Sequence, residues 1–199
     1  MSDSPPRGAV AGVAGGLVLM AVFTLWWSSL VVPGWRAEVA WPVFAAGAAA
    51  SLVFLAAAFR LFRAMRRFTA TGTPQDAVRG KRMGIAFGIV FGLEGLVIGV
   101  VARILTATGR DDYMVPAVAL VVGLHFYPMA PIFGRTVDYW IATWVVVVAV
   151  SGLVAVSRAG GAVAPVWSAV GLGVAVATGA YGAYMMRVGQ DLLRVAPTT

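Results

Sequence analysis

The residues most able to do chemistry in this sequence are an acid and an imidazole, each near the middle of an apolar stretch. Glu94 lies in Gly-Leu-Glu-Gly-Leu, and His125, the only histidine, lies in Gly-Leu-His-Phe-Tyr-Pro-Met-Ala-Pro. An ionisable side chain at mid-membrane costs about 2.5–3.5 kcal/mol on insertion scales and is functional by default. On consecutive antiparallel helices the two side chains share one depth and offset this cost by pairing. We expect them to bind and release protons as one coupled unit. The other seven acids are expected in termini, loops or interfaces.

Two prolines and a tyrosine follow this histidine. Pro128 and Pro131 cannot donate to the carbonyls of Leu124 and Tyr127, so the helix is expected to kink or open one turn from His125. Free carbonyls at membrane depth are tolerated only against protein or a watered cavity. The Tyr127 hydroxyl is a third candidate, off the His125 face. In the structural alternative, a Glu–His hydrogen bond merely locks two helices together.

Other chemistry is not indicated by the residue types. The chain has no cysteine and one histidine, which leaves too few ligands for a metal site within one chain. No serine lies at mid-membrane beside His125 to act as a nucleophile. No phosphate-binding loop or nucleic-acid-binding face is present. We therefore expect no metal, no cofactor and no nucleic-acid partner.

The elements that carry these residues follow from composition. The 199 residues are 60% hydrophobic and 12% charged, with a mean hydropathy of +0.88, whereas soluble domains are about 45–50% apolar and about 25% charged. This excludes a soluble domain, a disordered chain and a disulfide scaffold. Six stretches are long enough to cross a bilayer. They predict an all-α, polytopic membrane helix bundle of six transmembrane helices forming a single domain, 1–199: Ala9–Val32, Trp41–Arg63, Met83–Leu105, Met114–Gly134, Asp138–Ser157 and Val163–Met186.

The basic residues predict the orientation. Eleven of the fifteen Lys and Arg fall on one side of the six stretches, and this side is expected to be cytoplasmic together with both termini. Ala, Gly, Val and Arg are abundant, which suggests a GC-rich bacterial genome and hence a bacterial inner (plasma) membrane. The basic loop Arg60–Arg82 is either a contact for anionic lipid or phosphate, or a set of snorkelling anchors.

Glycines line one face of the third stretch. We call this set the glycine stripe: Gly84, Gly88, Gly92, Gly95 and Gly99. At 100° per residue they fall within about 80° of one another. Lipid offers no hydrophobic drive between helices, so a glycine face is useful only where another backbone comes close. We expect this helix to be central and tightly packed. The alternatives are a sliding surface or a seam between copies in a homo-oligomer.

One local pattern is familiar. The segment Gly123–Ala130, with Tyr139-Trp140, resembles a loose set of small, uncharacterised bacterial six-helix membrane proteins that share a Leu-His-Phe-x-Pro-x-Ala core. The resemblance covers the third to fifth stretches and implies no activity.

The Glu94–His125 pair is compatible with three kinds of function. The first is a proton-coupled transporter or channel for a small solute or cation, with Glu94 as proton carrier and His125 as its partner. The second is an intramembrane enzyme acting on a lipid or isoprenoid, with the pair as acid and base, and a pocket that opens sideways to lipid. The third is a packing or assembly subunit. We expect the first, and so no catalytic residues in the enzymatic sense.

Overall fold

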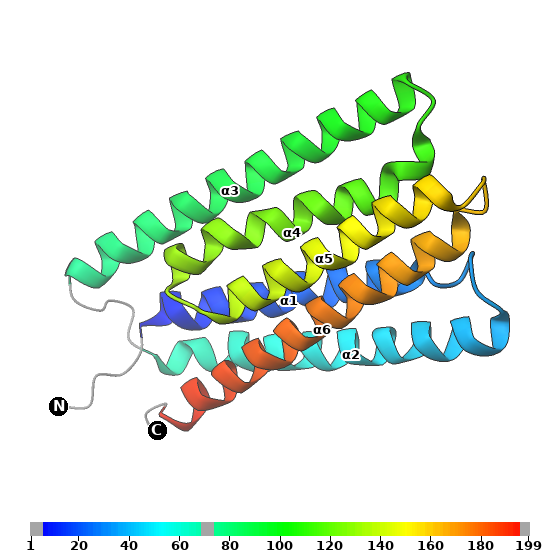
Figure 1. Ribbon diagram of the computed structural model, residues 1–199. Helices are drawn as coiled ribbons and strands as arrows, with labels where there is room; N and C mark the ends of the chain where they lie inside the picture. Colours follow the sequence, from blue (N-terminus) through cyan, green and yellow to red (C-terminus); the bar gives the residue numbers. More distant parts are fainter. Residues whose placement is uncertain (1–5, 69–73, 196–199) are drawn as a thin grey trace.

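The computed structural model describes residues 6–68 and 74–195, and all regular structure within them is helical. Six long helices follow one another along the chain (Figure 1): α1 (Arg7–Ser29), α2 (Ala37–Ala64), α3 (Pro74–Ala107), α4 (Met114–Phe133), α5 (Val137–Arg158) and α6 (Ala164–Arg194). Two short 3-10 helices, η1 (Met65–Arg67) and η2 (Asp111–Tyr113), extend α2 and precede α4. Each long helix has the length and apolar composition needed to cross a membrane.

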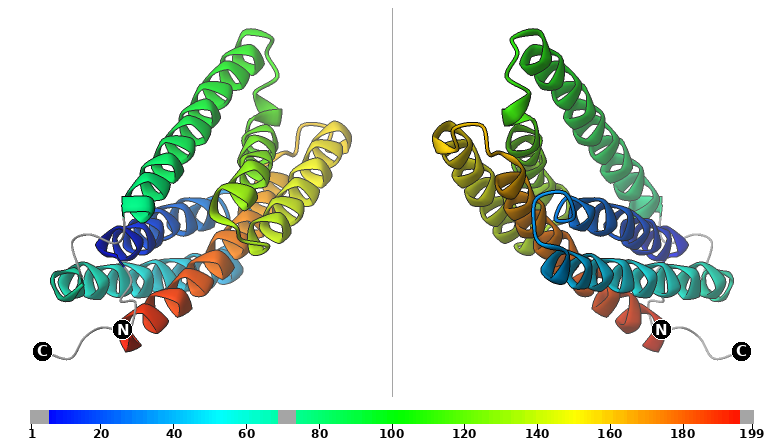
Figure 2. Two further views of the ribbon diagram at one scale, coloured as in Figure 1. Left: turned by 90° about the vertical axis from the view of Figure 1, so that its left-hand side faces the viewer. Right: turned by 90° about the vertical axis from the view of Figure 1, so that its right-hand side faces the viewer.

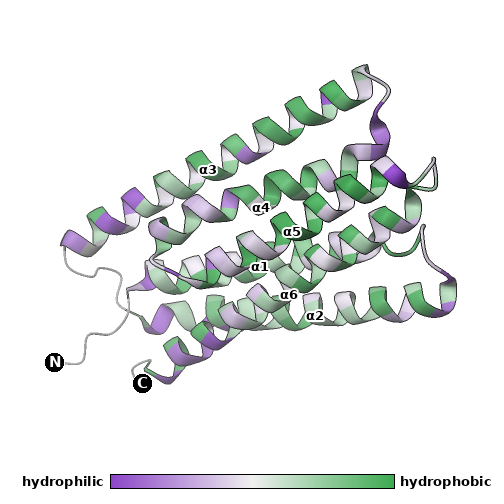
Figure 3. Cartoon of the chain, viewed as in Figure 1, coloured by the Kyte–Doolittle hydropathy of each residue, from purple (hydrophilic) through white to green (hydrophobic). Residues whose placement is uncertain are grey.

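The six helices confirm the all-helical class, and each expected apolar stretch falls on one of them. Two helices extend well beyond their stretches. α3 begins at Pro74, well before Met83, and α6 continues past Met186 to Arg194. These extensions are hydrophilic and lie at the end of the bundle where α1 begins and α6 ends (Figure 3). We call this end the terminal face and the opposite end the distal face.

The core of the bundle lies around α1 and α6. α1 packs against both α2 and α6, and α6 also contacts α5, which pairs with α4. Leu17 and Trp27 on α1, Val145 on α5 and Val174 on α6 are fully buried. Many large apolar side chains face outward from the helices, among them Leu52, Leu96 and Trp140. Between the two faces the helices are coloured mostly green to white, with a few hydrophilic bands (Figure 3).

Two glycines of α6 allow its neighbours to approach closely. A Cβ atom at Gly171 would lie 2.9 Å from the carbonyl oxygen of Trp27 on α1. A Cβ atom at Gly182 would collide with the ring of Phe54 on α2. Small residues at helix contacts are the usual means of bringing helices together where lipid supplies no drive for association. The seams of α6 with α1 and α2 therefore depend on these positions.

α3 is the helix that stands apart from the others (Figures 1 and 2). It packs chiefly on α4, and the rest of its surface is exposed. The expectation that this helix is central is therefore wrong for the single chain. Along the glycine stripe, Cβ atoms would meet nothing within 4 Å at any of the five positions. The stripe is exposed because it lies on a different side of α3 from the contact with α4. That contact uses the row that includes Phe87, Val90 and Glu94, and the stripe lies roughly 120° around the helix from this row.

Candidate functional site

Glu94 and His125 meet at the seam between α3 and α4. The Nδ1 atom of His125 lies 3.1 Å from Oε1 of Glu94, and their side chains are 13% and 7% exposed. Glu94 is the only buried residue in the described part of α3, where the other described side chains are half-buried or exposed. The separation is that of an ion pair when the imidazole is protonated, although the angles do not reach hydrogen-bond geometry. The sequence-based expectation of a mid-helix acid facing a mid-helix imidazole agrees with this geometry.

The local sequences explain why these two side chains face each other. α3 and α4 are antiparallel, and Phe87 on α3 packs against Phe133 on α4 with ring centroids 6.1 Å apart. That contact fixes the register of the two helices, and Glu94 lies two turns further along the same row of α3. His125 lies about two turns before Phe133 on α4, which places the two ionisable groups at the same height.

The structure does not bring Tyr127 to this pair. Its hydroxyl lies 3.1 Å from Oγ1 of Thr143 on α5, and its ring lies beside that of Tyr139. The side chain therefore helps to join α4 to α5. α4 itself runs as one helix through Pro128 and Pro131 to Phe133, so the proline segment is not opened into a non-helical stretch. The prolines still leave two carbonyls of the preceding turn without a helical donor.

A second polar cluster, which sequence reasoning missed, lies near the terminal face. Asp138, in the first turn of α5, is completely buried rather than at an interface. Arg135 reaches from the α4–α5 turn to α6, where Nη1 donates to the Tyr181 hydroxyl at 3.3 Å and contacts the Met185 sulfur at 3.3 Å. Asp138 lies close enough to Tyr181, Arg135 and His125 to interact with all three, yet neither carboxylate oxygen forms a hydrogen bond of good geometry in the described residues.

The sequence did contain a signal for the burial of Asp138. The buried residues of α5 recur every three or four positions, and Asp138 begins the row, which continues with Ala142, Val145, Ala149, Gly152 and Val156. Such a row marks the face of a helix that packs inward. Extending the row back by one turn would have placed Asp138 inside. On sequence alone, Asp138 is instead grouped with the acids of termini, loops and interfaces.

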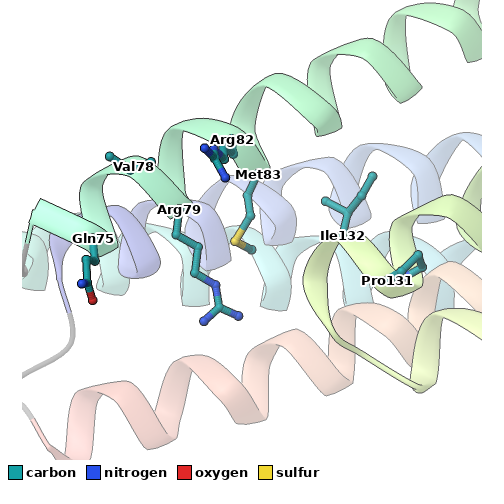
Figure 4. Close-up of a pocket in the computed structure, with 7 residues that line it drawn as sticks. All are labelled: Gln75, Val78, Arg79, Arg82, Met83, Pro131 and Ile132. Atoms are coloured by element: carbon teal, nitrogen blue, oxygen red, sulfur yellow. The ribbon is translucent and has the colours of Figure 1, made fainter.

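A cleft opens between α3 and α4 at the terminal face. Its volume is about 590 Å³, and its walls are formed by Gln75, Val78, Arg79, Arg82, Met83, Pro131 and Ile132. Arg79 and Met83 point from α3 toward the side on which the two α4 residues lie (Figure 4). Two cations among mostly apolar lining residues suit an amphiphile with an anionic head. Glu94 and His125 are not among the lining residues.

The described residues contain no group of three or more His, Cys, Asp or Glu side chains that could hold a metal ion. The ionisable side chains of the Glu94–His125 pair and of Asp138 can bind protons and can interact with a charged ligand.

Comparison of the chain with protein-family models, curated proteins and solved structures finds no significant match.

Proposed function

We propose that this chain is a multi-pass protein of a bacterial inner membrane, with the terminal face in the cytoplasm. Six helices of spanning length and composition support insertion. So do the large apolar side chains on their outer surfaces, such as Leu52, Leu96 and Trp140, which are 63% to 76% exposed. The terminal face holds most of the Lys and Arg, as expected for a cytoplasmic side.

Within that setting, we propose that the protein moves a small solute or cation in exchange for, or together with, protons. Glu94 carries the proton, and His125 is the partner that binds it when Glu94 releases it. The observation that carries this proposal is the 3.1 Å approach of His125 Nδ1 to Glu94 Oε1 between two largely buried side chains. Intramembrane carboxylate and imidazole groups are typical of proton relays in pumps and transporters.

The attachment of α3 also supports transport. One of the two proton-binding groups sits on a helix that packs chiefly on α4, so α3 can shift without breaking contacts with the core formed by α1 and α6. Helices that change position around a charged site are a common basis for switching between states. A purely structural lock has no need for two ionisable groups, because neutral hydroxyl side chains would join the helices at lower cost.

The test uses purified protein in liposomes that contain a pH-sensitive dye and carry a pH gradient. Addition of Na⁺ or K⁺, and then of a panel of small neutral solutes, should release the gradient with the wild type. Glu94→Gln should abolish that release. The matched control is Glu38→Gln, which changes an exposed acid that pairs with Arg36 outside the helical core; this variant should transport normally.

Unchanged transport by Glu94→Gln would remove Glu94 from the mechanism. A wild type that moves no protons with any of these probes would count against transport as a whole.

The second candidate is an enzyme that acts on a lipid, and the cleft between α3 and α4 favours it because two arginines are among its lining residues. In that case the pair serves as general acid and base. The separation of the cleft lining from Glu94 and His125 places this candidate second. We propose anionic lipid as a partner at the cleft under either function.

A further inference from the structure

Asp138 is a second buried acid, and the function proposed for the Glu94–His125 pair gives it no role. Its side chain has no exposed surface, and neither carboxylate oxygen has a hydrogen bond of good geometry within the described residues, although the Tyr181 hydroxyl lies close enough to be a partner. Buried polar groups in proteins nearly always have partners, so an exception requires an explanation. A buried charge without hydrogen bonds is costly unless other charges or a proton compensate for it.

The groups around Asp138 connect it to both the terminal face and the pair. Three ionisable groups interact with its carboxylate in the described part of the chain: Arg135 from the α4–α5 turn, Tyr181 from α6 and His125 from α4. Arg135 is only partly buried and lies at the terminal face, where its guanidinium donates to the Tyr181 hydroxyl. Asp138 therefore lies between a solvent-accessible cation and the imidazole at mid-bundle.

The distance between Asp138 and His125 is too long for direct contact but short enough for electrostatic coupling. About two and a half turns of α4 separate His125 from Gly134, roughly 13 Å at the usual rise per residue. Asp138 is the second residue of α5, so the chain has returned by less than one turn and the two groups differ in height by roughly 10–12 Å. Across that distance in a protein interior, loss of one charge changes the proton affinity of the other group on the order of tenfold.

We propose that Asp138 is a second proton-binding residue, coupled electrostatically to His125, which controls when the imidazole passes its proton to Glu94. A hydronium ion at the terminal face gives one proton to the Asp138 carboxylate: an O–H bond of the hydronium breaks, an O–H bond forms on Asp138, water is left, and the negative charge of Asp138 is removed. The positive charge on His125 then loses a compensating anion. The Nδ1–H bond breaks, and the proton forms an O–H bond with Glu94 Oε1.

These steps transfer protons and no electrons. One proton enters at Asp138, and one moves from His125 to Glu94. The inference rests on the proposed function for its role in transport, but the coupling itself can be measured without transport.

The single histidine makes the test direct. Full-length protein with ¹⁵N-labelled histidine, in lipid nanodiscs, gives one imidazole to follow by NMR as pH is varied. In Asp138→Asn the imidazole should lose its proton at roughly tenfold higher proton concentration than in the wild type. The matched control is Asp191→Asn, which changes an exposed acid on α6 that is paired with Arg194 at the same face; its titration should match the wild type.

An Asp138→Asn titration identical to that of the wild type, or an equal shift in Asp191→Asn, would overturn the proposal. Should Asp138→Asn fail to fold, Asp138→Ser tests the same coupling, because it removes the same negative charge with a smaller side chain and should shift the titration in the same direction. If the NMR coupling is present while Glu94→Gln transports normally, the proposed function fails and the inference about coupling stands. If Glu94→Gln abolishes transport and the coupling is absent, only the role of Asp138 is lost.

Discussion

Arg135 donates from Nη1 to the hydroxyl oxygen of Tyr181 at 3.3 Å, which ties the turn between α4 and α5 to the middle of α6. The turn is tight because Gly134 adopts a φ of +63°, a conformation that a residue with a side chain rarely takes. The guanidinium also contacts Met185, one turn further along α6. This link fixes α6 against the α4–α5 hairpin beside Asp138.

Removing the Tyr181 hydroxyl should weaken this link. We expect Tyr181→Phe to lower the free energy of unfolding by about 1 kcal/mol, the typical net value of one hydrogen bond. Tyr184→Phe is the control, because the Tyr184 ring lies beside Tyr181 but its hydroxyl has no hydrogen bond in the described residues. Unfolding in detergent, followed by circular dichroism, measures both. Equal stability of the two variants would show that the Arg135–Tyr181 contact contributes nothing.

The glycines of α6 and α3 should respond differently to substitution. Gly171→Ala places a methyl group 2.9 Å from the Trp27 carbonyl oxygen, and overpacking of this kind costs about 1–3 kcal/mol. Gly92→Ala meets nothing within 4 Å and should leave the melting temperature unchanged or slightly raised, because alanine favours helix. Light scattering of Gly92→Leu in detergent should show the mass of the wild type. A change in that mass would identify the glycine stripe as a seam between copies.

Glu94 and His125 should depend on each other energetically. In a double-mutant cycle of Glu94→Gln and His125→Gln, we expect a coupling free energy of at least about 1 kcal/mol, above the roughly 0.6 kcal/mol average of interhelical hydrogen bonds. The reason is that each single change leaves a buried polar partner uncompensated. Thermal unfolding in detergent gives the four stabilities. Additive effects would show that the 3.1 Å contact is not an energetic pair.

The cleft at the terminal face should bind anionic lipid. Addition of phosphatidylglycerol should raise the melting temperature of the wild type in detergent, because a ligand stabilises the state that it binds. The double variant Arg79→Gln with Arg82→Gln should lose most of this rise. The double variant Arg66→Gln with Arg67→Gln removes the same charge from exposed positions outside the cleft and should keep it. An equal loss in both variants would indicate general charge attraction, and a full effect with inorganic phosphate alone would indicate a water-soluble ligand.

The absence of cysteine allows orientation to be measured with single introduced thiols. Ala162→Cys lies in the exposed loop between α5 and α6, and Gln190→Cys lies at the exposed end of α6. With the terminal face in the cytoplasm, a membrane-impermeant maleimide should label the first in intact cells and the second only after permeabilisation. The reverse pattern would invert the proposed orientation. Labelling of both in intact cells would show that the chain does not span the membrane as proposed.

Composition alone was enough to predict six helices of spanning length, because hydrophobicity and length are local properties and each helix satisfies its own backbone hydrogen bonds. The approach of Glu94 to His125 was also predictable from sequence. Consecutive helices joined by a short connection are antiparallel neighbours, and two residues at the middle of such helices must lie at the same height.

Only the tertiary structure decided which faces of the helices meet. The spacing of the glycine stripe is the same whether α3 lies inside the bundle or outside it, and packing against α4 alone leaves the stripe exposed. Asp138 is a similar case: its burial depends on α6 passing over the first turn of α5, a contact between helices whose angle and rotation the sequence does not specify. Hydrophobicity and length are set residue by residue along the chain, whereas burial depends on neighbours that only the packed bundle supplies.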